Sequence, residues 1–329
     1  MKKEAGLFRV ISAWMMVLCM AVLCLPSPVD AAAKDAKETA DAQAAENKPT
    51  EWKDVAYGSL SGKQKMDIYL PSTGKGPYPV IVAFHGRHED KTGPEMEAPL
   101  MGLSRGYAVA CVNYREAEEA RFPADVMDVK AAVRFLKANA SKFHLDGSHV
   151  AAWGDSFGGK LAAFIGTTSS HRELDDLSVG PRGQSSRVNA AVVLFPALDE
   201  VHMDSDFKSL GITPALPRNE EAYGMEMYGA PIQSIPDLVA FHDPTRYISA
   251  DAVPFFIEHG TADNVCPITQ SERFADRLRH TIGSSNVTFV SLEGAGHHVK
   301  DFMGEENMEK IFRFLDKHMK VKEKKSKTK

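Results

Sequence analysis

The stretch Gly154-Asp155-Ser156-Phe157-Gly158-Gly159 joins two segments of different character. Residues 149–153 (HVAAW) have the pattern of a short buried strand, and residues 160–165 (KLAAFI) that of the first turns of a helix. So tight a turn between strand and helix requires glycines, because the Cβ atom of any other residue would collide with the neighbouring backbone. The serine is then strained, its hydroxyl projects, and the helix amino terminus offers free N–H groups. The pattern predicts an activated nucleophile; the alternative is a simple packing turn.

Buried strands alternate with helices along most of the chain. Apolar runs typical of strands lie at residues 78–84, 107–113, 190–195, 253–258 and 287–292. Helical patterns lie at residues 100–104, from 122 onward, from about 159 and at 269–280. Residues 55–70 alternate apolar and polar side chains, which predicts an antiparallel hairpin at the sheet edge. This order predicts an α/β fold with a mostly parallel central sheet and helices on both faces.

Two further strands are followed by residues capable of catalysis. His259-Gly260-Thr261-Ala262-Asp263 follows the run at 253–258, and Glu293-Gly294-Ala295-Gly296-His297-His298 follows the run at 287–292. In open α/β sheets, functional sites collect at the carboxyl ends of the strands. Serine, aspartate and histidine therefore occur at strand ends in the chain order Ser156, Asp263, His297.

The first 31 residues have the composition of a secretory signal peptide. Lys2, Lys3 and Arg9 precede an apolar run at residues 11–25, and prolines and small residues follow it. The run is shorter than the about 20 residues of a membrane span. We expect cleavage after Ala31 or Ala33 and export to the periplasm or outside the cell, without a stable membrane span. Lipidation at Cys24 is the weaker alternative.

The remaining chain divides by composition into three parts. Residues 32–50 are predicted to be a spacer, and residues 51–319 are long enough for one large α/β domain. Residues 320–329 are predicted to be a basic, solvated tail, and attachment of this tail to an anionic surface is an alternative. The formal net charge of −5 excludes nucleic acid as a partner. Cys111 and Cys266 are predicted to stay reduced.

Taken together, these motifs resemble the α/β-hydrolase superfamily, and within it bacterial acetyl-xylan esterase-like and feruloyl esterase-like carboxylesterases of the BD-FAE type. The resemblance spans about residues 67–315. It is carried by Phe84-His85-Gly86, Tyr114-Arg115, Phe122-Pro123, the segment 154–159, His259-Gly260 with Asp263, Pro267, Gln270-Ser271 and Gly294-Ala295-Gly296-His297. The resemblance implies an α/β-hydrolase fold with a small cap or rim, for which we take the irregular stretches 168–188 and 201–244.

The resemblance also implies the catalytic roles. Ser156 is the expected nucleophile, His297 the general base and then acid, and Asp263 the carboxylate that orients His297. His298 is the alternative histidine, and its more natural place is the mouth of the pocket. Asp199, which follows the strand at 190–195, is the alternative acid; otherwise it serves a turn or a helix cap.

An oxyanion hole needs two N–H donors, and the sequence departs from the family pattern at one of them. Phe157 supplies the first donor through its backbone. The second is expected from the loop after Phe84, where the family has His-Gly-Gly and this chain has His85-Gly86-Arg87, so either Gly86 or Arg87 supplies it. The Arg87 side chain narrows the pocket or attracts an anionic group, or else it is simply solvated. His85 is expected to shape the loop by hydrogen bonding.

No cofactor is predicted, because neither a dinucleotide fingerprint nor a Walker loop is present. We predict no metal either. A zinc site of His85, His88, His297 and His298 is the weaker alternative, since no acidic ligand stands at helical spacing with them.

The resemblance implies an exported serine esterase that hydrolyses short acyl esters, acetyl esters above all, on carbohydrate such as xylan. Its expected partner is a small ester or an acylated carbohydrate. Two alternatives are an exopeptidase of the same fold and, less favoured, a non-catalytic binding protein. Six cap side chains are candidates for an apolar acyl pocket, with cap core as the alternative: Met203, Tyr223, Met225, Met227, Tyr228 and Phe241.

Overall fold

The computed structural model of the protein describes residues 51–215 and 220–319. The predicted signal peptide, the spacer and the basic tail lie outside these ranges, so they stay predictions. Among the described residues, no helix combines the length and apolarity needed to cross a membrane. Cys111 and Cys266 are both buried, and no disulfide joins them.

The described residues form an eight-stranded sheet in the order β1-β2-β4-β3-β5-β6-β7-β8. The strands are β1 Glu51–Ala56, β2 Lys65–Tyr69, β3 Tyr78–Phe84, β4 Ala108–Val112, β5 Leu145–Asp155, β6 Ala190–Leu194, β7 Phe255–Gly260 and β8 Val287–Leu292. The first two strands pair antiparallel with each other, β2 pairs antiparallel with β4, and every other pair is parallel. The predicted edge hairpin and the mostly parallel sheet are therefore confirmed.

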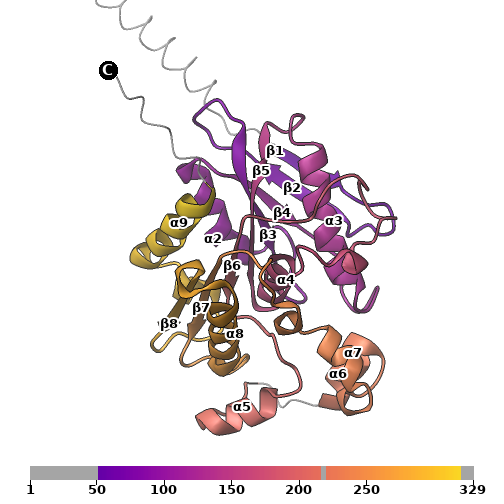
Figure 1. Cartoon of the computed structure of the whole chain (residues 1–329), viewed down its shortest axis with the longest axis vertical. Coiled ribbons are helices and arrows are strands. Elements are labelled where there is room, and N and C mark those ends of the chain that lie inside the picture. The colour runs from indigo at the N-terminus through magenta and orange to yellow at the C-terminus, as the bar shows by residue number, and fades with distance from the viewer. Residues whose placement is uncertain (1–50, 216–219, 320–329) are drawn as a thin grey trace, which may run out of the picture. The chain divides into compact units, whose positions relative to one another are not determined.

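Helices cover both faces of this sheet (Figure 1). They are α2 Glu97–Leu100, α3 Ala124–Ala138, α4 Ser156–Thr167, α5 Met203–Leu210, α6 Glu220–Tyr228, α7 Pro236–Phe241, α8 Ile268–Ile282 and α9 Glu305–Met319. Short 3-10 turns occur at Pro94–Met96, Met101–Arg105, Arg172–Leu174, Ile232–Ser234, Pro244–Tyr247, Ser284–Asn286 and Val299–Phe302. The helices α3, α4 and α8 pack on one face, and α2 and α9 on the other.

The central strands are apolar on both sides because both sides are covered. In β3, Val80, Val82 and Phe84 enter the core beneath α3 and α4, whereas Ile81 and Ala83 enter the core beneath α9. All five side chains are at most 1% exposed. Burial on two faces explains why these strands appear in the sequence as continuous apolar runs rather than as alternating ones.

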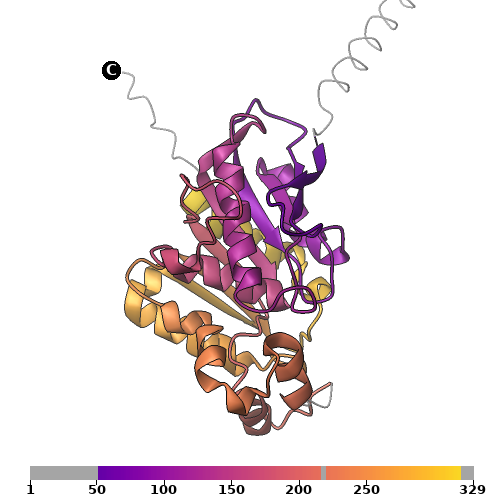
Figure 2. The same cartoon turned by 90° about the vertical axis from the view of Figure 1, so that its right-hand side faces the viewer.

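The predicted cap segment 201–244 is not irregular, and in this respect the prediction was wrong. It contains α5, α6 and α7, and the orange and salmon ribbons of these helices gather at one end of the domain in both views (Figures 1 and 2). Segment 168–188 is closer to expectation, with only the 3-10 turn Arg172–Leu174. The cap helices have 6 to 9 residues. Isolated helices of this length are unstable, so packing on the domain must support them.

Candidate active site

The turn between β5 and α4 has the strained geometry that its sequence predicts. Ser156 has φ 50°, in the left-handed region that a residue with a Cβ seldom occupies. A Cβ on Gly154 would lie 2.1 Å from the Gly158 oxygen, and one on Gly158 would lie 2.1 Å from the Phe84 oxygen. The two glycines therefore let the start of α4 approach both β5 and the end of β3. This approach sets the Ser156 hydroxyl at the carboxyl edge of the sheet.

The structure brings Ser156, His297 and Asp263 into one hydrogen-bonded series. His297 Nε2 lies 2.9 Å from Ser156 Oγ, and His297 Nδ1 lies 2.7 Å from Asp263 Oδ2. The three residues follow β5, β8 and β7, which end at the same edge of the sheet. With Nδ1–H donated to the carboxylate, Nε2 of a neutral His297 is left to accept the serine proton.

Asp263 is held in its ionised form by the groups around it. Burial opposes the charge, but contacts with His259 and His297 outweigh burial and hold the pKa of Asp263 well below its usual range. Its Oδ1 also accepts hydrogen bonds from the backbone N–H groups of Val265 and Cys266, each at 2.8 Å. The carboxylate is thus both charged and fixed in orientation.

The loop after β3 lies beside the turn that carries the serine. His85 donates from Nδ1 to the Gly86 oxygen at 2.7 Å and stacks on Tyr114, so it shapes the loop as predicted. Burial lowers the pKa of His85 to about 4. The Gly86 N–H, one of the two candidates for the second oxyanion donor, donates to Glu89 Oε2 at 2.6 Å. The described residues provide no acceptor for the backbone N–H of Arg87. The backbone N–H of Phe157 lies in the first turn of α4, where N–H groups have no partner within the helix.

Carboxyl groups gather next to this loop. Burial and the neighbouring charge of Glu95 raise the pKa of Glu89 to about 7. Burial, with Glu89 and Glu95 adding to it, also raises the pKa of Asp155 well above its usual range. Glu89 is therefore an acidic group in the pocket of Ser156 whose charge changes with pH near 7.

A pocket of about 510 Å³ opens at Ser156 and His297. Nine of the thirteen residues that line it have polar or charged side chains: Arg87, His88, Glu89, Pro94, Glu95, Asp155, Ser156, Phe195, Val265, His297, His298, Val299 and Lys300. His298 and Arg87 both lie at this pocket, as predicted. The six cap side chains proposed for an acyl pocket do not line it. Met203, Met227 and Tyr228 are buried in the protein core instead, and Met225 and Phe241 are 47% and 43% exposed.

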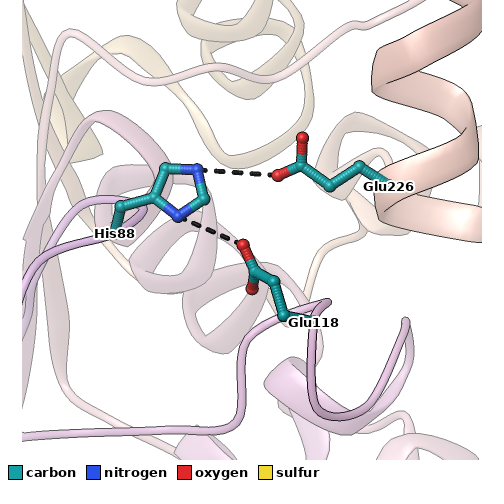
Figure 3. A group of neighbouring side chains, drawn as sticks. All are labelled: His88, Glu118 and Glu226. Atoms are coloured by element: carbon teal, nitrogen blue, oxygen red, sulfur yellow. Dashed lines mark ion pairs between the residues drawn. The ribbon is translucent and has the colours of Figure 1, made fainter.

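Charged contacts connect the β3 loop to the cap helix α6. Arg87 Nη1 lies 2.9 Å from Glu226 Oε1, and the Arg87 guanidinium lies 5.1 Å from the centre of the Tyr223 ring. Figure 3 shows the His88 ring between two carboxylates, with Nε2 3.5 Å from Glu226 and Nδ1 3.1 Å from Glu118. Arg87 is thus partly exposed and paired with Glu226, rather than simply solvated.

The group of His88, Glu118 and Glu226 is the one cluster of possible metal ligands found within residues 51–215 and 220–319. Each carboxylate faces a different ring nitrogen in Figure 3, and Glu226 is also paired with Arg87. The contacts with His88 and Arg87 already give both carboxylates partners, so these side chains need no metal ion to be held together. His85 and His297 have the separate hydrogen-bond partners given above, so the alternative zinc set is not assembled.

The alternative acid, Asp199, has a different position. Its Oδ1 accepts from the backbone N–H groups of Val201 and His202, and its Oδ2 contacts His202 Nδ1 at 2.7 Å. It serves the turn before α5, which was the other expectation for it.

Sequence reasoning missed three residues at the site. Phe195 packs edge-on against His297, with ring centres 4.7 Å apart. Glu89 accepts a hydrogen bond from the Gly86 N–H. The Nε2 atom of His259 lies 3.3 Å from Asp263 Oδ2. Only His259 carried a signal, because it stands four residues before Asp263 in the motif at the end of β7.

Comparison with known proteins identifies the family. The BD-FAE family model matches residues 66–278. The chain belongs to the BD-FAE family. Solved structures confirm the α/β-hydrolase fold: a truncated carbohydrate esterase from gut microbiota is 28% identical, with a TM-score of 0.72, over 83% of this chain and 98% of that one. A bifunctional GH43-CE protein of Bacteroides eggerthii is 29% identical, with a TM-score of 0.72, over 82% of this chain and 38% of that one.

Curated relatives of this BD-FAE chain are larger proteins. Esterase LipC of Mycobacterium tuberculosis is 29% identical over 59% of this chain and 45% of its own length. The probable carboxylic ester hydrolase LipM of the same organism is 28% identical over 74% of this chain and 55% of its own length. The chain therefore spans about half the length of these relatives.

Proposed function

We propose that this BD-FAE protein is a serine carboxylic ester hydrolase with Ser156 as nucleophile. The observation that carries the proposal is the series Ser156, His297, Asp263, with hydrogen bonds of 2.9 and 2.7 Å, at the base of the pocket. The names of the relatives, esterase and carboxylic ester hydrolase, support the same reaction.

In the proposed mechanism, His297 Nε2 takes the Ser156 proton as Oγ attacks the ester carbonyl carbon. Asp263 stabilises the imidazolium that results and keeps Nδ1 protonated. His297 then gives its proton to the departing alcohol oxygen, leaving an acyl group on Ser156. Water, activated by the same imidazole, releases the acid and restores the serine.

The tetrahedral intermediates carry a negatively charged oxygen. We propose that the backbone N–H groups of Phe157 and Arg87 donate hydrogen bonds to it. Arg87 is preferred to Gly86 because Glu89 already accepts the Gly86 N–H. Each such donor contributes about 3 to 4 kcal/mol of transition-state stabilisation in enzymes where one has been removed.

We infer that the substrate is a short acyl ester, such as acetate, on a carbohydrate. Charged and imidazole groups at Arg87, Glu89, His298 and Lys300 surround the pocket, and such a rim suits a hydrated sugar better than a long acyl chain. The structural neighbours described as carbohydrate esterases support this substrate class. Export, based on residues 1–31, would bring the enzyme to extracellular polysaccharide.

The test is a series of p-nitrophenyl esters of increasing acyl length, assayed beside acetylated xylan. We expect the acetyl ester to be turned over fastest, acetate to be released from the xylan, and Ser156→Ala to lose at least about 1,000-fold in kcat. An aminoacyl p-nitroanilide serves as the peptidase control. Faster turnover of the anilide, or full activity of Ser156→Ala, would contradict the proposal.

Export is tested by the mass of the protein that cells release. We expect a mature chain beginning at Ala32 or at Lys34, found outside the cytoplasm. A full-length chain retained in the cytoplasm would contradict export and leave the esterase proposal standing.

A further inference from the structure

His259 is a fully buried histidine beneath the proposed catalytic carboxylate. It belongs to β7 and is 0% exposed. Its Nδ1 lies 2.7 Å from Ser271 Oγ on α8, and its Nε2 lies 3.0 Å from the Cys266 oxygen. The same Nε2 lies 3.3 Å from Asp263 Oδ2. This ring is therefore in contact with the carboxylate without lining the pocket.

These contacts determine which ring nitrogen of His259 carries hydrogen. A backbone carbonyl oxygen can only accept, so Nε2 must be the donor to Cys266. Nδ1 of the neutral ring then accepts from the Ser271 hydroxyl. The single N–H of His259 consequently points at the Cys266 oxygen and, by a longer contact, at Asp263 Oδ2.

Asp263 is surrounded by donors on both oxygens. Oδ1 accepts from the N–H groups of Val265 and Cys266, Oδ2 accepts from His297 Nδ1–H at 2.7 Å, and His259 Nε2 lies 3.3 Å from Oδ2. The turn fixes Oδ1, but His259 is the group that faces the oxygen used by His297. Its position decides how Oδ2 is presented to the His297 ring.

We propose that His259 is a positioning residue for catalysis, which aligns Asp263 Oδ2 with His297 through its Nε2–H, while Ser271 holds His259 in the required tautomer. The inference rests on the proposed esterase function. It extends the series to Ser271, His259, Asp263, His297 and Ser156, running from α8 through β7 and the loop after β8 to α4. Without His259, the carboxylate keeps its charge but loses one of the two contacts that orient Oδ2.

The proposal predicts that two substitutions at residue 259 differ in their effect on kcat. His259→Gln places an amide N–H where Nε2 stood, whereas His259→Leu offers no donor. We expect His259→Leu to lower kcat per active site by about 10- to 100-fold, as for loss of one hydrogen bond to a charged group, with KM nearly unchanged. We expect His259→Gln to stay within about fivefold of the wild type.

Active sites are counted by complete reaction with a fluorophosphonate, so that unfolded protein does not enter kcat. His318→Leu is the control, because His318 is a partly buried histidine on α9 whose ring packs against Phe314 rather than against the Ser156 series. This control is expected to lose stability but to keep its kcat per titrated site.

If His259→Leu does not fold, His259→Asn replaces it, because its shorter amide cannot reach Oδ2. Wild-type kcat per site in His259→Leu or His259→Asn, or a loss in His259→Gln as large as theirs, would overturn the inference alone. A wild-type protein that neither turns over esters nor reacts with the fluorophosphonate would overturn the proposed function, and this inference with it.

Discussion

At the scale of single residues, Glu89 gives the site a property that the family motif does not predict. Its carboxyl accepts the Gly86 N–H at 2.6 Å and lines the pocket with Ser156. Burial and the charge of Glu95 raise the pKa of Glu89 to about 7. An ionised Glu89 is thus a less favourable neighbour for an oxyanion than a protonated one.

The raised pKa predicts how Glu89 affects stability. The ordinary value is 4.5 and the folded value about 7, so between these pH values the folded state holds a proton that the unfolded state has released. The contribution of Glu89 to stability therefore falls as pH rises from about 4.5 to 7 and then levels off. Glu89→Gln, which keeps an acceptor for Gly86, is expected to gain stability relative to the wild type across this range.

Urea unfolding midpoints at pH 5, 6, 7 and 8 measure the effect. Glu97→Gln, at an exposed position of α2, controls for the loss of one negative charge. A difference in unfolding midpoint between Glu89→Gln and the wild type that stays constant at all four pH values would contradict the raised pKa of Glu89.

The residues of the site were predictable to different degrees. Ser156, Asp263 and His297 could be placed because they follow the ends of β5, β7 and β8, and parallel strands end at one edge. Glu89 could not, since its contact with Gly86 depends on the path of the loop after β3. Phe195 could not, since its contact with His297 depends on how the segments after β6 and β8 meet.

At the scale of elements, α6 holds the loop that carries Arg87. Glu226 on this helix pairs with Arg87 at 2.9 Å and with His88 at 3.5 Å, and Tyr223 lies against the Arg87 guanidinium. Tyr223 also donates to Glu200, which lies 3.5 Å from Lys160 on α4. The cap helix therefore links the β3 loop to the helix that begins at Ser156.

Removing the α6 contact is expected to affect activity more than stability. Glu226→Ala removes ion pairs between partly exposed side chains, which changes the free energy of unfolding by less than about 1 kcal/mol. It also frees Arg87, so we expect kcat/KM to fall about tenfold through misplacement of the oxyanion donor. Glu118→Ala is the control, because Glu118 contacts His88 but not Arg87. Equal losses in kcat/KM for the two variants would contradict this role of α6.

The cap helices show where sequence patterns are insufficient. Segment 201–244 contains Pro214, Pro217, Pro231, Pro236 and Pro244, which interrupt helical periodicity and favour an irregular interpretation. The central strands β4, β6 and β7, in contrast, are recognisable without knowledge of their neighbours because they are buried on both sides.

At the scale of the whole molecule, the parallel sheet is what assembles the site. Residues separated by more than 200 positions, such as Arg87 and His297, line the same pocket because β3, β5, β7 and β8 end at one edge. The alternation of strands and helices is enough to predict this architecture. It does not predict where the cap helices lie relative to the pocket, whose lining includes none of the six cap side chains proposed for it.

The most direct test of the central claim is to locate a fluorophosphonate adduct by mass spectrometry of the digested protein. An activated Ser156 attacks phosphorus, displaces fluoride and keeps the phosphonyl group. We predict one adduct per protein, on the peptide that contains Ser156, and no adduct in Ser156→Ala. An adduct on another residue, or an unmodified Ser156 in protein that reagent has inactivated, would contradict the account.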